Sequence, residues 1–120
     1  MTITFIPTSQ GNIAEIISDD IIINNVEEAL DIMANCVYQN ADILLLYEKN
    51  ITPTFFDLST KLAGDILQKF STYRAKLIIV GDFSTYNSKS LHDFIYESNK
   101  HKRINFVANR EEALGIFESN

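Results

Sequence analysis

Five polar residues follow shortly after three apolar segments of the chain, and their types could support chemistry. Each apolar segment is typical of a β-strand, and in open α/β sheets ligands gather beyond the carboxyl ends of the strands. Carboxylates, hydroxyls and a guanidinium at one edge are the groups that a small enzyme or a small-molecule-binding protein uses. A polar rim is expected on any fold of this kind, so as an active-site signal it is weak. The five rim residues are Glu48, Asp82, Ser84, Tyr86 and Arg110.

Motifs that define common catalytic sites are absent from the sequence. It contains no GxGxxG, GxxxxGKS/T, GxSxG or HExxH pattern. His92 and His101 form no spacing with carboxylates or cysteines that marks a metal pair or a triad, and we interpret both as surface residues. Cys36 is the single cysteine, which excludes an intrachain disulfide and a cysteine-based zinc site within one chain. We therefore assign no catalytic residue, no metal site and no cofactor.

The composition is that of one globular α/β domain spanning residues 1–120. The chain is 46% hydrophobic and 22% charged, which is too apolar for disorder, and it has no apolar run long enough for a membrane span. Its first residues lack the positive region and the long apolar stretch of a secretory signal. These features predict a cytoplasmic protein.

The charge of the chain argues against binding to nucleic acid or to an anionic membrane. The net charge is −6, whereas both kinds of binding depend on Lys and Arg neutralising phosphates. The charge is uneven, because residues 1–60 hold nine acids and one base while residues 61–120 hold seven acids and nine bases. Residues 100–103 contribute three of these bases, and we interpret that segment as a solvated loop.

Alternating and periodic apolar residues predict the first elements. Residues 2–6 and 13–17, on either side of a turn-like segment, predict a β-hairpin. Asn25 with Glu28 three residues later is typical of a helix start, and apolar residues at helical spacing continue to Val37. The amino-terminal third therefore reads as a hairpin followed by a helix.

Two continuously apolar segments, 43–47 and 77–80, predict interior parallel strands covered on both faces. An amphipathic helix over 58–70 lies between them, and its start stays open between Thr52-Pro53 and Asp57. A helix after Ser88, a strand over 104–107 and a helix after Asn109 complete the chain. The order is ββαβαβαβα, which predicts a mixed, mostly parallel sheet whose helices divide between its faces or stack on them.

Several segments resemble one family over nearly the whole chain. They are Phe55–Gly64, Leu67–Phe70, Lys76–Ser84, Ser88–Leu91 and Asp93–Asn99. In them the chain resembles a family of short bacterial proteins described as domain of unknown function 4180. This resemblance implies the family and does not imply a function.

The element order also resembles the STAS fold of anti-sigma-factor antagonists. In that family an Asp-Ser-Ser/Thr-Gly segment at the start of the second helix carries a phosphorylatable serine. The resemblance implies that Ser59 is a phosphoacceptor candidate, with Asp57 and Thr60 beside it; Leu58 stands where a serine is expected, and Thr60 stands where glycine is expected. The alternative is that all three are ordinary helix-start residues.

The sequence favours a non-enzymatic regulatory or protein-interaction module with an unknown protein partner. That partner would meet the start of the second helix and the adjoining strand-end loops, and an exposed Tyr38, Tyr73 or Tyr96 could anchor it. The alternative is a small-molecule-binding protein or small enzyme that uses the rim. A homodimer through a helix face or the hairpin edge is a third possibility.

Overall fold

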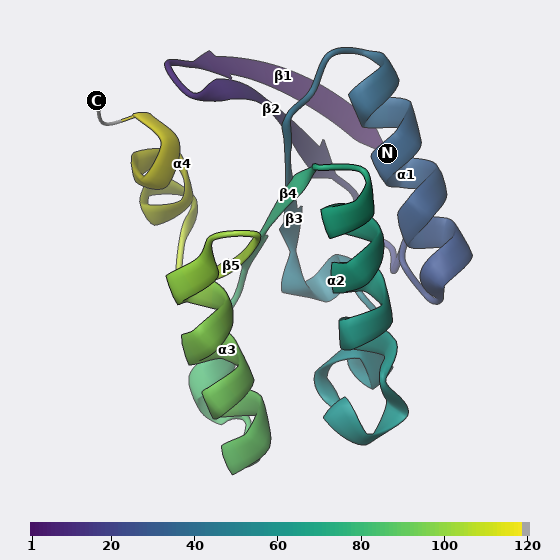
Figure 1. Ribbon diagram of the computed structural model, residues 1–120, viewed down its shortest axis with the longest axis vertical. Helices are drawn as coiled ribbons and strands as arrows, with labels where there is room; N and C mark the ends of the chain where they lie inside the picture. The colour runs from purple at the N-terminus through teal and green to yellow at the C-terminus, as the bar shows by residue number, and fades with distance from the viewer. Residues whose placement is uncertain (119–120) are drawn as a thin grey trace.

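The computed structural model describes residues 1–118, which form a five-stranded sheet with helices packed on it (Figure 1). β1 (Thr2–Thr8) and β2 (Gly11–Ile17) form an antiparallel hairpin. β3 (Ile43–Tyr47), β4 (Lys76–Val80) and β5 (Ile104–Val107) continue the sheet parallel to β2, in the order β1-β2-β3-β4-β5. The predicted α/β class, the hairpin and the element order are confirmed.

The two apolar segments are interior strands, as predicted. β3 lies between β2 and β4, and β4 lies between β3 and β5. Successive side chains of a strand point to opposite faces, so Leu44 and Leu46 enter the core on one side of the sheet while Ile43 and Leu45 enter the core on the other. Both faces of these strands are therefore dry.

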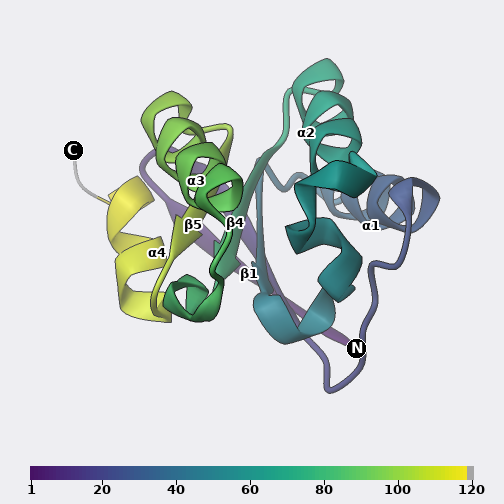
Figure 2. The same cartoon turned by 90° about the horizontal axis from the view of Figure 1, so that it is seen from below.

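The helices divide unequally between the two faces. α1 (Val26–Tyr38), α2 (Leu62–Thr72) and α3 (Lys89–His101) contribute to the larger core on one face. α4 (Arg110–Glu118) covers the other face with Ala113 and Phe117 (Figure 2). The sequential strand order explains this arrangement, because right-handed crossovers between neighbouring parallel strands place every connecting helix on the same face.

Side-chain caps begin three of the helices where the sequence predicts them. The Asn25 side chain accepts a hydrogen bond from the Glu28 backbone N–H at 2.8 Å, and the Glu28 carboxylate accepts one from the Asn24 N–H at 2.8 Å. Ser88 caps α3 through the Leu91 N–H at 3.1 Å. Asn109 accepts from the N–H of Glu112, its capping-box partner, at 2.8 Å. These bonds satisfy backbone donors that the first helical turn leaves free.

The second helix begins later than its periodicity predicts. Residues Pro53–Phe56 and Leu58–Thr60 form two separate 3₁₀ turns, and α2 begins only at Leu62. The Thr60 hydroxyl bonds to the carbonyls of Thr54 and Asp57, and Lys61 has a left-handed backbone with φ 68°. These local bonds compete with helix formation, which explains the difference. Residues 53–57, left open by the sequence, are thus a turn outside the helix.

The free edge of β5 is closed by a side chain. The Asn99 amide, from the last turns of α3, accepts from the Phe106 N–H at 2.7 Å and donates to the Phe106 carbonyl at 3.2 Å. One side chain therefore satisfies the outward-pointing donor and acceptor of an edge-strand residue. It occupies the place that a neighbouring strand would take.

The basic segment 100–103 differs in part from the solvated loop that the sequence predicts, because Lys100 and His101 belong to the last turn of α3. Lys100, His101 and Lys102 are exposed. Arg103 is half-buried, and its Nη1 donates to the Ala75 carbonyl at 3.0 Å. This arginine joins the start of β5 to the residue that precedes β4, which a local charge pattern does not predict.

Candidate functional site

The carboxyl ends of the parallel strands meet at the lower edge of the sheet in Figure 1. There, β3 continues into the 3₁₀ turn η1 (Glu48–Asn50), and β4 is followed by the turn η4 (Phe83–Thr85). Two residues separate the end of β5 from the start of α4. This edge, which we call the rim, holds the five rim residues of the sequence, but their side chains form three separate groups.

The first group joins Arg110 to two residues that sequence reasoning missed, Glu15 and Tyr47. Arg110 donates to both carboxylate oxygens of Glu15, from Nε at 2.8 Å and from Nη2 at 3.0 Å. The Tyr47 hydroxyl donates to Glu15 Oε2 at 2.7 Å. The Glu15 side chain is 7% exposed, so this paired guanidinium and phenol compensate a charge that burial would otherwise make costly. The group also ties the first turn of α4 to β2.

This group fixes the protonation states of its members. The hydrogen-bonded Arg110 guanidinium holds the pKa of Glu15 below its usual value, although burial opposes it. Burial, together with the Glu15 carboxylate, raises the pKa of Tyr47 to about 12. The carboxylate is therefore ionised and the phenol protonated near neutral pH, which suits holding α4 in place better than transferring protons.

We expect the free energy of unfolding of Tyr47→Phe to fall less at alkaline pH than that of the wild type. A phenol whose pKa rises from about 10 in the unfolded chain to about 12 in the fold stabilises the protein fully below pH 10, and loses that contribution as pH rises toward 12. About 1.4 kcal/mol of this contribution is lost by pH 11. Urea unfolding at pH 8 and pH 11 measures it. Tyr38→Phe, at a tyrosine that is 89% exposed, is the control, and equal pH slopes for both variants would contradict the expectation.

The second group joins Glu48 to Tyr86. The Tyr86 hydroxyl donates a very short hydrogen bond to Glu48 Oε2, and burial together with this carboxylate raises the pKa of the phenol. Gly81 permits the arrangement, because a Cβ at this position would lie 2.6 Å from Glu48 Cβ. His92 Nε2 lies 2.6 Å from the Tyr86 carbonyl oxygen. Since a carbonyl only accepts, this nitrogen donates, and it holds the backbone of Tyr86.

The third group is local. Asp82 Oδ1 accepts hydrogen bonds from the Ser84 N–H at 3.1 Å and from the Ser84 hydroxyl at 2.6 Å. These bonds hold the pKa of Asp82 below its usual value. Asp57 makes the same pair of bonds to Ser59, at 3.1 and 2.6 Å. Both aspartates therefore cap exposed 3₁₀ turns, and Ser59 lies three residues before the first residue of α2.

The groups do not converge on one reaction centre. Tyr47 and Glu48 are consecutive, and Tyr47 packs on the α4 side of the sheet while Tyr86, the partner of Glu48, packs on the other side. Within residues 1–118, no group of three or more His, Cys, Asp or Glu residues is placed to hold a metal ion. The arrangement is suited to holding loops and to presenting a carboxylate beside aromatic rings.

A hollow of about 260 Å³ opens at the rim beside Glu48. Ile21, Ile51, Pro53, Phe56 and Tyr86 form its apolar walls, and Lys49 also borders it. The Phe56 and Tyr86 rings are stacked, with centroids 5.2 Å apart. The walls of the hollow are therefore mainly apolar, and Glu48 supplies the one carboxylate that borders it.

Buried Asn50 fixes the position of the Ile21 wall. Its side-chain Nδ2 donates to the carbonyls of Ser18 at 2.8 Å and Asp20 at 2.9 Å, and its backbone carbonyl accepts from the N–H of Ile22 at 2.8 Å. Asn50 is fully buried. These bonds attach the loop between β2 and α1 to η1, so the wall contributed by that loop is held by the fold.

Five contributors to the rim were missed by sequence reasoning, and two of them carry a local signal. Glu15 is a charged residue inside an apolar strand, which by itself requires a buried partner. Gly81 directly follows a strand, and the Glu48 side chain approaches it too closely for a Cβ. Tyr47, Asn50 and His92 carry no such signal. The partner of Tyr47 lies 32 residues away, the two partners of Asn50 lie 32 and 30 residues away, and the partner of His92 lies 6 residues away.

Comparison with known proteins gives a family and no function. No curated protein and no solved structure matches the chain significantly. None of the helices within residues 1–118 has both the length and the apolar character that crossing a membrane requires. The family model described as Domain of unknown function (DUF4180) matches residues 8–116, so this chain belongs to that family.

Proposed function

We propose that this protein is a non-enzymatic protein-interaction module whose partner meets the rim. The observation that carries the proposal is the separation of the rim groups. Glu15 with Arg110 and Glu48 with Tyr86 are each engaged with a partner inside the chain, on opposite sides of the sheet. An acid–base enzyme needs such groups to converge on one reacting atom, with a proton that moves near neutral pH.

The size of the rim hollow also supports the module. Sites for drug-sized ligands and cofactors have volumes of roughly 300–1,000 Å³, and the hollow beside Glu48 has about 260 Å³. A volume of this size suits one side chain of a protein better than a whole metabolite. Exposed apolar side chains such as Ile21, which is 45% exposed, give a partner surface to cover.

Affinity capture with matched variants tests the proposal. The immobilised protein is exposed to a lysate of the cells that produce it, and retained proteins are identified by mass spectrometry. We expect a protein retained by the wild type and by Tyr73→Asp, but lost on Ile21→Asp. Both substitutions place a carboxylate at an exposed apolar residue. Tyr73, a possible anchor by sequence, follows the end of α2 away from the rim, so a partner at the rim does not need it.

Two results of this capture would reject the module. One is that no retained protein distinguishes Ile21→Asp from Tyr73→Asp. The other is that native mass spectrometry of the protein purified from its own cells shows a bound metabolite that Ile21→Asp releases. The second result would favour the small-molecule alternative.

We also propose that the module is regulated at Ser59, in the manner that the STAS resemblance implies. The Ser59 hydroxyl is exposed and donates to Asp57. A phosphate there would replace this bond by repulsion between a dianion and a carboxylate, and would change the turn that leads into α2. The regulatory signal would thus reach the partner surface through residues 57–61.

For this regulation we expect phosphate on Ser59 and not on Ser84 in protein isolated from its own cells. Ser84 is a close local control, because it has the same bonds to an aspartate two residues earlier and is also exposed. Phosphopeptide mapping by mass spectrometry measures both sites. Equal modification of the two serines, or a Ser59→Ala strain in which partner capture is unchanged under all growth conditions, would reject the switch.

A further inference from the structure

The carboxylate in the rim hollow keeps an uncompensated charge. Tyr86 donates to Glu48 Oε2, and within the described part of the chain no group donates a hydrogen bond to Glu48 Oε1. The neighbouring Lys49 ammonium lies 3.8 Å from Asp19 instead, and both side chains of that pair are largely exposed. Glu48 is therefore oriented by a neutral phenol, and among residues 1–118 no cation forms an ion pair with it.

Aromatic and apolar walls surround this carboxylate. Phe56 and Tyr86 present stacked rings, and Ile21 and Pro53 border the same hollow. A cation beside a carboxylate and against aromatic faces gains ionic hydrogen bonds and cation–π attraction together. A long side chain with apolar methylene groups and a charged end matches both parts of such a surface.

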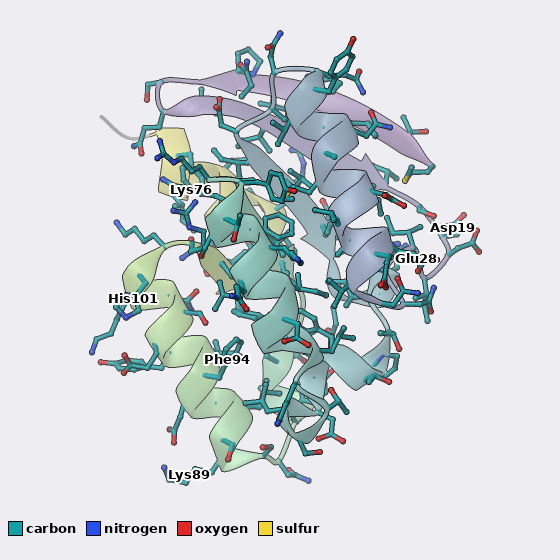
Figure 3. The ribbon with its side chains drawn as sticks, turned by 45° about the vertical axis from the view of Figure 1, so that its right-hand side comes forward. Asp19, Glu28, Lys76, Lys89, Phe94 and His101 are labelled. Atoms are coloured by element: carbon teal, nitrogen blue, oxygen red, sulfur yellow. The ribbon has the colours of Figure 1, made fainter. Side chains whose placement is uncertain are left out.

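The charges around the opening have the sign that attracts a cation. Asp20 precedes Ile21 and Asp57 follows Phe56, so acidic residues flank two of the walls. In Figure 3, Asp19 and Glu28 lie at the right near α1, whereas Lys89 begins α3 at the bottom of the view and His101 ends it at the left. Acidic residues thus flank the hollow, and Lys49, the one base of the first sixty residues, also borders it.

We propose that the rim hollow receives an arginine side chain of the partner protein. Arginine fits better than lysine because its planar guanidinium stacks on aromatic rings and offers several donors to one carboxylate. Glu48 is the charge partner, and Tyr86 both positions it and forms the stacking wall, backed by the buried Phe56 ring. This inference rests on the proposed interaction function and specifies the residue that the partner contributes.

NMR titration with blocked peptides tests the inference. The probe is acetyl-Gly-Leu-Arg-Leu-Gly-amide, and its matched control replaces arginine by citrulline, which has nearly the same shape and no charge. We expect the arginine peptide to shift amide signals at residue 21, residues 48–56 and residues 81–86, with a dissociation constant of about 1 mM. The citrulline peptide is expected to bind about tenfold more weakly, because it lacks the charge-assisted bond. A lysine peptide is expected to fall between the two.

Variants separate the hollow from general attraction to an acidic protein. Glu48→Gln is expected to weaken the arginine peptide about tenfold, whereas Glu97→Gln, which removes the same charge from the surface of α3, leaves its binding unchanged. Ile21→Lys places a cation at the opening and is expected to abolish binding; since Ile21 is 45% exposed, this substitution keeps the fold. Amide signals away from the hollow verify folding of each variant.

Equal binding of the arginine and citrulline peptides would overturn the inference. So would equal effects of Glu48→Gln and Glu97→Gln, or shifts that map to α1 instead of the hollow. A captured partner that is lost on Ile21→Asp but still binds Glu48→Gln would leave the interaction function standing and reject the arginine. Absence of any rim-dependent partner would reject the function whatever the peptides show.

Discussion

Phe55→Ala is expected to lower the free energy of unfolding by about 3–5 kcal/mol. Phe55 lies in the turn before α2, is 1% exposed, and contacts the Phe56 ring edge-to-face at 5.0 Å. Truncation removes buried apolar surface and leaves a cavity below the rim hollow. Urea unfolding followed by circular dichroism measures the change.

The size of this effect decides whether the turn belongs to the core. A loss of 3–5 kcal/mol is a large part of the roughly 5–15 kcal/mol that stabilises an ordinary domain. Tyr73→Ala is the control, because this side chain is 56% exposed and its removal is expected to change stability by no more than about 0.5 kcal/mol. Similar small changes for both variants would show that residues 53–56 are a loop lying on the core and not a part of it.

Gly81→Ala is expected to destabilise the protein by roughly 1–3 kcal/mol and to separate Glu48 from Tyr86. The added Cβ would lie 2.6 Å from Glu48 Cβ and 2.5 Å from Glu48 Oε1. Because Cβ is fixed to the backbone, rotating the Glu48 side chain does not relieve the first contact. The strand end or η1 must shift, and the hydrogen bond from Tyr86 is lost.

Gly64→Ala provides a control of opposite sign. A Cβ at Gly64 meets nothing within 4 Å, and the residue lies within α2, so alanine is expected to stabilise the helix by about 1 kcal/mol. Spectrophotometric titration of the tyrosines supplies a second readout. Losing the Glu48 carboxylate removes one cause of the raised pKa of Tyr86, so that phenol should ionise at lower pH in Gly81→Ala. A Gly81→Ala variant as stable as the wild type, in which Tyr86 ionises at an unchanged pH, would contradict the close approach of Glu48 to Gly81.

The sequence predicts those parts of the fold that local patterns determine. Unbroken apolar runs identify β3 and β4 as interior strands, because only a strand covered on both faces needs no polar alternation. The helix caps at Asn25, Ser88 and Asn109 depend on residues three positions apart, which a linear reading captures. The rim itself follows from topology, since parallel strands end at one edge.

The groupings within the rim depend on distances that a linear reading does not contain. Glu15 and Arg110 are 95 residues apart, and Glu48 and Tyr86 are 38 apart. The sequence predicts too early a start for α2, because apolar spacing continues through Leu58 while the hydrogen bonds of Asp57 and Thr60 favour a 3₁₀ turn. The interaction function, the phosphoacceptor Ser59 and a homodimer stay predictions.

The Asn99 side chain blocks one edge of the sheet, the outer side of β5, against pairing with a further strand. Its amide occupies the backbone groups of Phe106 on the outer side of β5, so hydrogen-bonded growth of the sheet in that direction first requires removing this side chain. β1 is the opposite border. If copies of this chain ever joined border to border, β1 would meet β1, and the two blocked borders would face outward. Such an assembly stops at two copies, so the mostly parallel sheet does not extend into fibres.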